Sequence, residues 1–478
     1  MRSCRTYPLL FIGLVLILSA CKVGRNYRGT SYTPPAGYVN TEGEADTTAL
    51  AGLAGRDTLD WWRLFQDPEL EALVQEALRN NRDLNAAILN IEKAALSLKI
   101  NRADMLPKIG VQGNYTYGNY PFLFDEEARS TAFGGGTVSW ELDLWGRIRR
   151  LNEAARADLL GNQYAVRAVQ LELISAVAST YFQLLEFRTD REISLRTLAL
   201  RDSMYQLINA RFQGGIAAEI DLDQARIQRA IAASSVPVFE RQIAFTEHAL
   251  SVLVGRAPGV VPTVTELADV ARPPDIPAGL PSDLLLRRPD ILAAEQAVVA
   301  QNAIAGAAVA QQFPTISLTG LLGVASTDLA GFSSGATAYS VSGSILGPLF
   351  QFGQNRRRVK VERLNTEQAL LAYEQTVLTS FQEVEDALVA IRTLKAEQEA
   401  RQAHVNAAMH AEFLSGERYD KGVTSYLESL ESQRQSFESQ LGLAGTRRQL
   451  LSSYVQLYKA LGGGWPTEEE RKRAQEKR

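Results

Sequence analysis

The chain has 478 residues, of which 46% are hydrophobic and 22% are charged, so it is long and apolar enough to bury a large core. Its 50 basic and 54 acidic residues give a formal net charge of −4, and this balance argues against nucleic acid as a partner. The mixed-sign run over residues 468–473 is typical of a solvated chain end and indicates a charged C-terminal tail over residues 466–478.

The first 20 residues have the pattern of a signal peptide. Two arginines precede an apolar run over residues 9–18, which is too short to span a bilayer. The run ends in Leu-Ser-Ala before Cys21, which resembles the lipobox of bacterial lipoproteins; an ordinary signal peptide that happens to precede a cysteine is the alternative. The lipobox predicts a signal peptide over residues 1–20 and a covalent lipid, S-diacylglycerol with an N-acyl chain, on Cys21.

Cleavage after residue 20 would change what the mature chain carries. Two arginines would leave, which takes the formal charge to −6, from 48 basic and 54 acidic residues. Cys4 would leave as well, so Cys21 would be the only cysteine and no disulfide could form within a chain. Lys22 follows Cys21 where an Asp would resemble an inner-membrane retention signal. We therefore expect residues 21–60 to be a lipidated extension anchored in the bacterial outer membrane.

Helical periodicity over about residues 68–104 predicts the first helix, and two strands follow it. Apolar and polar residues alternate over residues 109–117 and again over residues 137–142. Half-apolar strands of about ten residues have the length that crosses a bilayer when tilted. The competing interpretation is a soluble hairpin packed on the helices.

A long helical hairpin is expected after the strands. No proline occurs from residue 122 to residue 236, and Leu159, Val166 and Leu173 recur every seven residues, as in coiled coils. The pattern predicts a helix over about residues 148–212, roughly 100 Å long at 1.5 Å per residue. A turn of small residues follows, and the helical pattern resumes over about residues 220–254.

The same features recur 207 positions later. Matching glycines and prolines carry this observation, because they set backbone geometry rather than composition; Pro107 matches Pro314, and Gly146 matches Gly353. The chain therefore predicts two structural repeats, over residues 61–257 and 282–465, with a Pro-rich linker over residues 258–281 between them. In the second repeat we expect helices over about residues 282–311, 355–419 and 427–461, strands over residues 316–324 and 340–345, and a heptad pattern at Leu370, Val377, Val384 and Ile391.

Four strands cannot close a barrel, and an open sheet edge cannot lie in lipid because its backbone groups would have no partners. Several chains must therefore share one barrel if the strands cross the membrane. Barrels of this kind have even strand numbers from eight upward, so a dimer, a trimer or a larger assembly is possible, and the pattern alone does not choose.

Several motifs in a fixed order point to a known family. They are Trp61-Trp62 with Phe65 and Asp67-Pro68, Asn81-Arg82-Asp83-Leu84, Pro107 before the first strand, Trp140-Glu141-Leu142-Asp143-Leu144-Trp145-Gly146, Leu280-Pro281-Ser282-Asp283-Leu284-Leu285 with Arg288-Pro289-Asp290, and Arg418-Tyr419-Asp420-Lys421-Gly422. Over residues 61–461 the chain resembles the TolC-like outer-membrane efflux proteins, within them the lipoprotein branch with NodT-type members.

The resemblance implies an α+β membrane protein that forms a homotrimer. Each chain would give four strands to a twelve-stranded β-barrel, which a long α-helical barrel of twelve helices continues through the periplasm. Such a protein is the passive exit duct of a tripartite efflux system, docked to a periplasmic adaptor and an inner-membrane pump. An exit duct for type I protein secretion shares this architecture. A tethered helical spacer that does not conduct is the alternative from another class.

The resemblance also suggests functional residues. It places a periplasmic gate at Glu428 and Glu431, whose spacing of three puts both carboxylates on one helix face, where threefold symmetry would stack them as acidic rings. Asp221 and Gln224 stand at the equivalent positions of the first repeat. Two solvated glutamates are the plainer interpretation. The adaptor is expected at the exposed hairpin tips, although turn chemistry explains their glycines equally well: Gly214, Gly215, Ile216, Gly422, Val423 and Thr424.

Enzyme functions find no support in the sequence. Three histidines, His248, His404 and His410, do not match a His-Glu-x-x-His zinc motif, and no phosphate-binding Gly-x-x-x-x-Gly-Lys-Ser/Thr loop is present. We expect neither metal nor cofactor besides the lipid, and a conduit without a nucleotide site must be driven by the pump that it joins.

Overall fold

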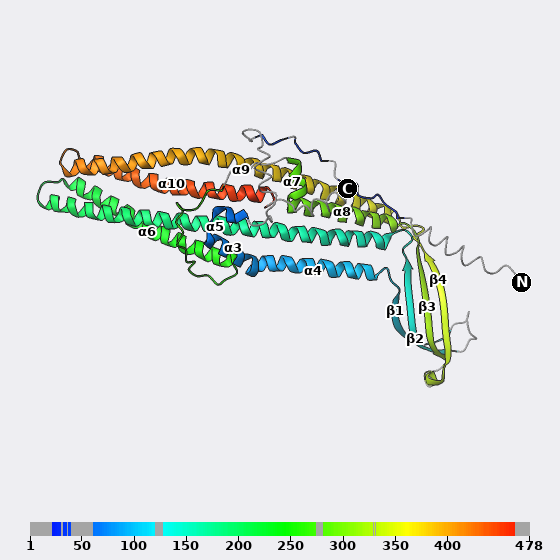
Figure 1. Ribbon diagram of the computed structural model, residues 1–478. Coiled ribbons are helices and arrows are strands. Elements are labelled where there is room, and N and C mark those ends of the chain that lie inside the picture. The colour runs from blue at the N-terminus through cyan, green and yellow to red at the C-terminus, as the bar shows by residue number, and fades with distance from the viewer. Residues whose placement is uncertain are drawn as a thin grey trace. The chain divides into compact units, whose positions relative to one another are not determined.

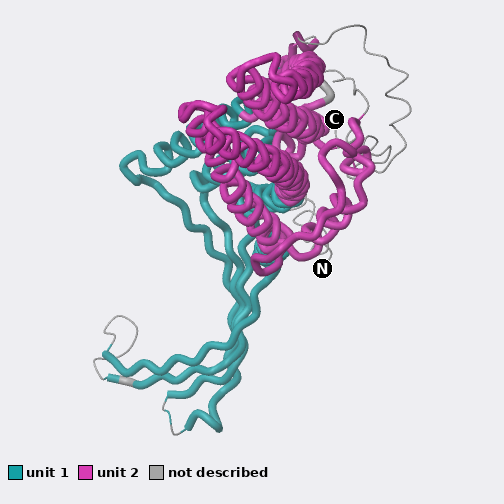
Figure 2. The backbone as a smooth tube through the Cα atoms, turned by 90° about the vertical axis from the view of Figure 1, so that its left-hand side faces the viewer, with its two compact units in different colours: residues 1–32, 89–164, 293–375 teal, residues 33–88, 165–292, 376–478 magenta. Residues whose placement is uncertain are grey.

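The computed structural model describes residues 22–29, 32–35, 37–39, 61–119, 128–273, 281–327, 329 and 331–463. The predicted signal peptide, Cys21, most of the extension and the tail lie outside the described residues. The chain forms two compact units, each with segments from both halves of the sequence (Figure 2). Unit 1 comprises residues 1–32, 89–164 and 293–375, and unit 2 comprises residues 33–88, 165–292 and 376–478.

Unit 1 contains an antiparallel four-stranded sheet with the strand order β1-β2-β3-β4 (Figure 1). The predicted strands are all present, and each is longer than its alternating pattern. A single-turn helix, η2 (Phe332–Ser334), precedes the last strand. The bounds are Lys108–Gly118 for β1, Arg129–Leu142 for β2, Thr315–Ser326 for β3 and Ala336–Leu346 for β4.

Helices accompany the sheet in unit 1. They are parts of α4 (Arg82–Ala103), α5 (Arg147–Gln213), α8 (Pro289–Ala310) and α9 (Gln354–Asp420). The contact between α5 and α8 is made of small side chains, which lets the two backbones approach closely. Ala154 and Ala157 of α5 form a buried cluster with Ala300 and Ala303 of α8.

Unit 2 is built from helices around an aromatic core. It contains η1 (Trp61–Phe65), α3 (Pro68–Asn80), α6 (Glu219–Leu253), α7 (Pro281–Arg287), α10 (Tyr426–Ala460) and the remaining parts of the longer helices. Phe65 packs on Phe182 with ring centroids 4.9 Å apart, and Trp61 stacks on Tyr458 at 5.2 Å. These rings fasten the start of the chain's helical part to α5 and α10.

The predicted long helices are confirmed. α5 and α9 each have 67 residues and begin and end within one residue of the expected bounds. Their heptad positions are buried at Val166, Leu173, Val377, Val384 and Ile391, whereas Leu159 and Leu370 are half-buried. The seven-residue repeat therefore faces the interior, as coiled-coil packing requires.

Two predicted helices are each divided in two. The helix expected over residues 68–104 is α3 followed by α4, because Asn81 adopts an extended backbone, with φ −60° and ψ 131°. Its side chain accepts a hydrogen bond from Leu84 N at 2.9 Å and donates to Leu253 O at 2.9 Å, so it starts α4 and ties it to α6. The helix expected over residues 282–311 breaks at Arg288, since the residue before a proline is disfavoured in α-helix.

Candidate functional site

The sheet has one apolar and one polar face. Strand register places the alternating apolar residues of all four strands on the same side; one cross-strand row contains Ile109, Val138, Gly320 and Val341. Ile109, Val138 and Val341 are exposed in the part of the chain that the structure describes, and Val111 in the next row is 93% exposed. An uncovered apolar face of this extent needs an apolar environment.

The opposite face carries mainly polar and small side chains, with Phe133, Leu321 and Leu346 as apolar exceptions. Ser139, Thr319 and Ser342 lie in one row, and in the next row toward the helices the hydroxyls of Ser317 and Ser344 are 2.7 Å apart. At the centre of this face Gly135 pairs with Gly323. A Cβ on Gly135 would lie 2.4 Å from Leu322 O, so the two strands approach too closely there for any side chain.

The sheet is open at both sides within one chain. β1 pairs only with β2 and β4 only with β3 among the described strands. Each outer strand has 11 residues, which is long for an unprotected edge in a soluble protein. The open edges and the uncovered apolar face indicate a sheet that is completed by other chains.

The two predicted hairpin tips have the same backbone geometry. Gly215 and Gly422 adopt φ values of +72° and +69°, which favour glycine. The next residues, Ile216 and Val423, donate from their N–H groups to Arg211 O and Arg418 O, both at 2.9 Å, which closes the Schellman motif that ends each long helix. Ile216 is 81% exposed and Val423 is 66% exposed, so both tips present an apolar side chain to solvent.

Behind the tips a buried cluster joins the two helical hairpins of unit 2. Tyr419 and Tyr426 lie 5.7 Å apart between ring centroids, and the Arg211 guanidinium lies 4.7 Å from the Tyr419 ring. The cluster members are Ile208, Leu222, Ala225, Tyr419, Tyr426 and Leu430. The sequence alone predicts no role for these residues; the signal that points to them is Tyr419, which begins the Tyr-Asp-Lys-Gly motif.

The predicted gate residues lie next to this cluster, and each has a local partner. Glu428 lies 3.7 Å from Arg418 and accepts a hydrogen bond from the Thr424 hydroxyl. Glu431 pairs with Arg434 at 2.6 Å. A hydrogen bond from the Arg434 guanidinium lowers the pKa of Glu431, which is opposite to the effect expected from like charges alone.

Asp221, the gate position predicted for the first repeat, is half-buried in the first turn of α6. Burial raises the pKa of Tyr426 to about 12, and the charges of Tyr419 and Asp221 add to the shift while Arg201 opposes it. The charge of Asp221 therefore reaches Tyr426 at the start of α10, the same helix turn that carries Glu428. The structure brings the three predicted acidic residues to the same pair of helix starts.

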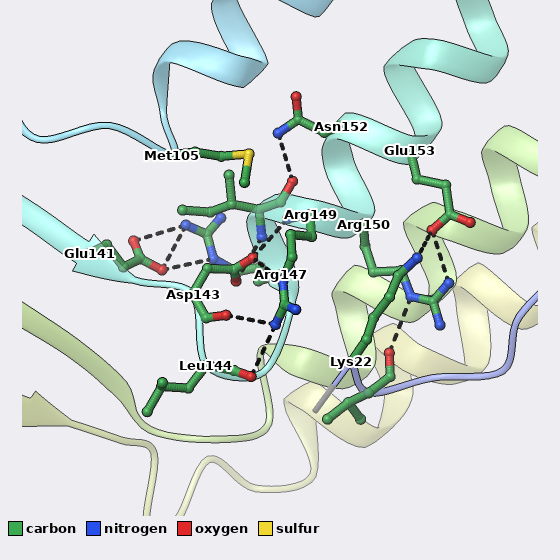
Figure 3. Close-up of polar contacts among 12 residues, drawn as sticks. Lys22, Met105, Glu141, Asp143, Leu144, Arg147, Arg149, Arg150, Asn152 and Glu153 are labelled. Carbon is green, nitrogen blue, oxygen red and sulfur yellow. Dashed lines mark hydrogen bonds and ion pairs between the residues drawn. The ribbon is translucent and has the colours of Figure 1, made fainter. Parts of the chain in front are cut away.

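A polar network occupies the turn between β2 and α5 (Figure 3). The Asp143 carboxylate accepts from Ile148 N at 3.0 Å and from Arg149 N at 2.8 Å, so it caps the first turn of α5. Glu141 forms a bidentate pair with Arg147, with both carboxylate oxygens 2.9 Å from Nη2. Arg150 has no exposed surface and bonds to the N-terminal segment.

Within the described residues, no group of three or more His, Cys, Asp or Glu side chains has the arrangement of a metal site. Cys21, the predicted lipidation site, lies outside the described residues.

Known proteins resemble this chain over most of its length. The family described as outer membrane efflux protein matches residues 73–256 and 280–463. Outer membrane protein OprJ from Pseudomonas aeruginosa is 34% identical over 470 residues, which cover 95% of this chain and 96% of OprJ. The solvent efflux pump outer membrane protein SrpC from Pseudomonas putida is 38% identical over 410 residues, which cover 84% of this chain and 86% of SrpC.

Solved structures share the fold as well. The crystal structure of the MtrE outer membrane channel from Neisseria gonorrhoeae matches with a TM-score of 0.81 and 29% sequence identity. The match covers 93% of this chain and 98% of that channel.

Proposed function

Because this chain belongs to the outer membrane efflux protein family, we propose that it assembles as a homotrimer into the outer-membrane duct of a tripartite efflux pump. Membership makes it an outer-membrane channel component of an efflux system, and the family is one of channels rather than enzymes. The proposal adds the trimer, the gate, the lipid anchor, the docking of a periplasmic adaptor and an inner-membrane pump, and small molecules as cargo. The name of the relative SrpC, a solvent efflux protein, supports that cargo class.

One observation carries the proposal: each chain offers a two-faced sheet with two open edges. An apolar outer face and a polar inner face are what a barrel needs when lipid surrounds it and water fills it. Closing the edges with strands from sibling chains satisfies the backbone groups of β1 and β4. Three chains of four strands give twelve, an even number within the known range.

Exposed helix faces support the same assembly. α4 leaves Leu89, Leu96 and Ile100 exposed, and the unit 1 part of α9 leaves Leu364 and Leu371 exposed. The spacing of seven residues, from Leu89 to Leu96 and from Leu364 to Leu371, is that of a coiled-coil seam. We propose that these two stripes meet between neighbouring chains and close the helical tunnel.

Internal duplication is the simplest origin of this architecture. The paired helices have equal lengths, 67 residues for α5 and α9, 35 for α6 and α10, and 22 for α4 and α8. The bounds within each pair are 207 positions apart, and the two family matches are offset by the same number. Both observations support two repeats of one unit.

Cysteine crosslinking between the outer strands tests the trimer. Pairs such as Asn114→Cys on β1 with Ser342→Cys on β4 lie on opposite edges of one chain's sheet, so a disulfide between them must join two chains. A panel of such pairs in the mature protein should give covalent trimers under oxidising conditions, whereas each single cysteine should not. A ladder that stops at dimers, or chains that stay uncrosslinked throughout the panel, would contradict the proposal.

We propose that Glu428 and Glu431 narrow the periplasmic entrance of this duct. Stacked carboxylate rings would attract cations and slow the passage of anions. Replacing both residues with Ala should raise single-channel conductance in planar bilayers and weaken cation selectivity. Gln224→Ala, at the position 207 residues before Glu431, is the matched uncharged control. Unchanged conductance and selectivity in the double variant would reject the gate.

The adaptor is proposed to dock on the hairpin tips. The exposed Ile216 and Val423, flanked by Gly214, Gly215, Gly422 and Thr424, support an apolar contact surface. Ile216→Asp with Val423→Asp should abolish export of a dye substrate in cells while leaving conductance of the purified channel intact. Full export by the double variant would place the docking surface elsewhere.

We further propose that Cys21 carries the S-diacylglyceryl and N-acyl chains. The lipobox-like sequence supports this modification. Mass spectrometry of the mature N-terminal peptide should show both additions, and Cys21→Ser should lack them. An unmodified Cys21 in protein from the outer membrane would reject the anchor and leave the channel proposal standing.

A further inference from the structure

The segment over residues 22–29 is held along one face of unit 1. Asn302 Nδ2 donates to Arg25 O at 3.2 Å, and the Tyr27 hydroxyl donates to Glu295 Oε1 at 3.0 Å. Glu295, Asn302 and Gly306 are spaced by seven and four residues, so they form one stripe of α8. We call residues 22–29 the strap.

Arg150 of α5 is the centre of this contact (Figure 3). Its side chain has no exposed surface. Nε donates to Val23 O at 3.2 Å and Nη2 donates to Gly24 O at 2.7 Å, while Nη1 donates to Glu153 at 3.0 Å. A buried guanidinium needs all these acceptors, because each unsatisfied N–H would cost the full desolvation of a charged group.

The first residue of the strap is fixed by charge. Lys22 pairs with Glu153, the carboxylate that also accepts from Arg150. Burial raises the pKa of Glu153, but the hydrogen bonds from Lys22 and Arg150 outweigh it and lower the pKa overall. In addition Val23 N donates to Trp145 O at 3.1 Å, so the strap joins the turn between β2 and α5.

Two glycines make the groove that receives the strap. Gly306 of α8 leaves room for Arg150, since a Cβ there would lie 2.7 Å from Arg150 Nε. Gly24 adopts φ +95°, and a Cβ on it would lie 2.9 Å from Gly306 Cα. The backbone of the strap therefore packs closely on the backbone of α8, and the Arg150 guanidinium lies against both glycines.

The corresponding arginine of the second half lacks this arrangement. Arg357, 207 positions after Arg150, is exposed and donates to Phe352 O at 2.9 Å within its own turn. The position 207 residues before Gly306 is Lys99. The Arg150 groove is thus particular to the turn that meets the N-terminal segment.

We propose that the Arg150 groove is a docking site for the strap, and that Arg150 is the positioning residue that fixes the N-terminal anchor point of the chain beside the β2–α5 turn. The strap begins at Lys22, directly after Cys21, so a group carried by that cysteine is delivered to the end of the sheet at which α5 begins. The docking stands on the contacts above; its role in anchoring rests on the acylation proposed for Cys21.

Limited proteolysis of the folded full-length mature protein tests the docking. Lys22, Arg25 and Arg28 are trypsin sites, and cleavage there requires the strap to leave the groove. Arg150→Ala should speed the release of strap peptides at least tenfold, measured by mass spectrometry. Arg357→Ala is the matched control and should leave the rate unchanged, and Arg150→Lys should give an intermediate rate because it retains the charge without the planar donors.

A second variant perturbs the strap and leaves Arg150 in place. Gly24→Val should also speed release at least tenfold, since the side chain cannot occupy the contact with Gly306. This variant decides the outcome if Arg150→Ala does not fold. Rates equal to that of Arg357→Ala in every variant that folds would overturn the docking.

The anchoring role is tested by a double-mutant cycle. The rate at which heat-resistant oligomers appear in cells is compared with and without Cys21→Ser, in the wild type and in Gly24→Val. We expect acylation to speed assembly in the wild type and to lose that effect when the strap is released. An equal effect in both backgrounds would overturn the anchoring role, while an unmodified Cys21 would reject the lipid and leave the proteolysis result valid.

Discussion

The two turns that lead from a strand to a long helix have a glycine in the same backbone conformation, but their side chains differ in chemistry. Gly146 and Gly353, 207 residues apart, have φ values of +77° and +80°. Before α5 the turn carries Glu141, Asp143 and the buried Arg150, whereas before α9 Leu349, Phe350 and Phe352 are all exposed. The glycine determines the backbone conformation of each turn, so the side chains around it can differ. The first turn binds the N-terminal segment, and the second presents an apolar surface beside the sheet.

A second pair of equivalent positions shows the same freedom within unit 2. Asp190 of α5 is buried, and burial together with the charge of Glu186 raises its pKa to about 7. Glu397 of α9 is half-buried, and its hydrogen bond from Arg401 lowers its pKa. Two carboxylates at the same place in similar helices therefore respond to pH in opposite directions.

The largest difference between the two halves should be the effect of Asp190 on the pH dependence of stability. Native Asp190 keeps its proton up to about pH 7, whereas an unfolded Asp releases it near pH 4, so this group makes the protein less stable as pH rises between those values. Asp190→Asn removes the dependence. Relative to wild type, its free energy of unfolding should rise by about 2 to 3 kcal/mol from pH 5 to pH 8.

Denaturant unfolding in detergent at fixed protein concentration measures this difference. Glu397→Gln is the control with the opposite sign: Glu397 stabilises above its ordinary pKa, and its contribution is lost as the pH falls through the lowered value. Parallel pH profiles for wild type and Asp190→Asn would show that Asp190 is ionised in the native protein.

The second-largest difference should come from the helix cap, which only the first turn has at this position. Asp143→Ala removes acceptors for Ile148 N and Arg149 N and the ion pair with Arg149, so it should cost about 2 kcal/mol. Phe350→Ala, at the equivalent position, removes an exposed ring and should change stability by less than about 0.5 kcal/mol. Unfolding midpoints compare them, and equal losses would mean that the second turn is capped as firmly as the first.

Replacing Gly146 or Gly353 with Ala should produce a smaller difference in stability between the two turns. Ala at either position must adopt a positive φ, which costs roughly 1 to 2 kcal/mol. At Gly146 the new Cβ would also lie 3.1 Å from Lys22 Cγ, whereas at Gly353 the nearest atom is Arg357 Nη1 at 3.7 Å. Gly146→Ala should therefore be the more destabilised variant and should also loosen the strap in the proteolysis assay. If trypsin released the strap from Gly146→Ala no faster than from Gly353→Ala, the expected contact between residue 146 and the strap would be contradicted.

The smallest effect is expected from the half-exposed ion pair of the first turn. Glu141→Gln weakens the bidentate contact with Arg147 and should cost about 0.5 to 1 kcal/mol, less at high salt. The second turn has Pro348 at the equivalent position and offers no such pair. A loss that does not shrink with salt would indicate a packing role for Glu141 instead.

The sequence predicts the elements of this fold well and their long-range contacts poorly. Heptads and the Gly215 and Gly422 turns define the long helices to within one residue, because both signals are local. The break at Asn81 was missed because its partner, Leu253 O, is distant in the chain. Pro289 could have predicted the break at Arg288, but the helical periodicity on both sides of it favoured one continuous helix.

The candidate sites divide in the same way. The family resemblance points to Glu428 and Glu431, and their spacing puts both on one helix face; the exposed tips follow from the turn glycines. Arg150 could not be singled out, because its acceptors at Val23 and Gly24 lie more than a hundred residues away and the strap has no periodicity. Which helix face meets the pore axis depends on neighbouring chains, so Glu428 and Glu431 stay a prediction.

The polar face of the sheet has a consequence for whatever passes along it. Its four central rows, from Gly110 to Thr116 on β1, contain no charged side chain, and Lys108 and Glu141 near the helical end are paired with Asp104 and Arg147. In the duct that we propose, a permeating molecule crosses this stretch past uncharged polar and small side chains, with Phe133 and Leu321 as the apolar exceptions. Along this part of the duct, bulk and flexibility, rather than the sign of its charge, then decide how fast it passes, whereas selection by charge falls to the proposed gate.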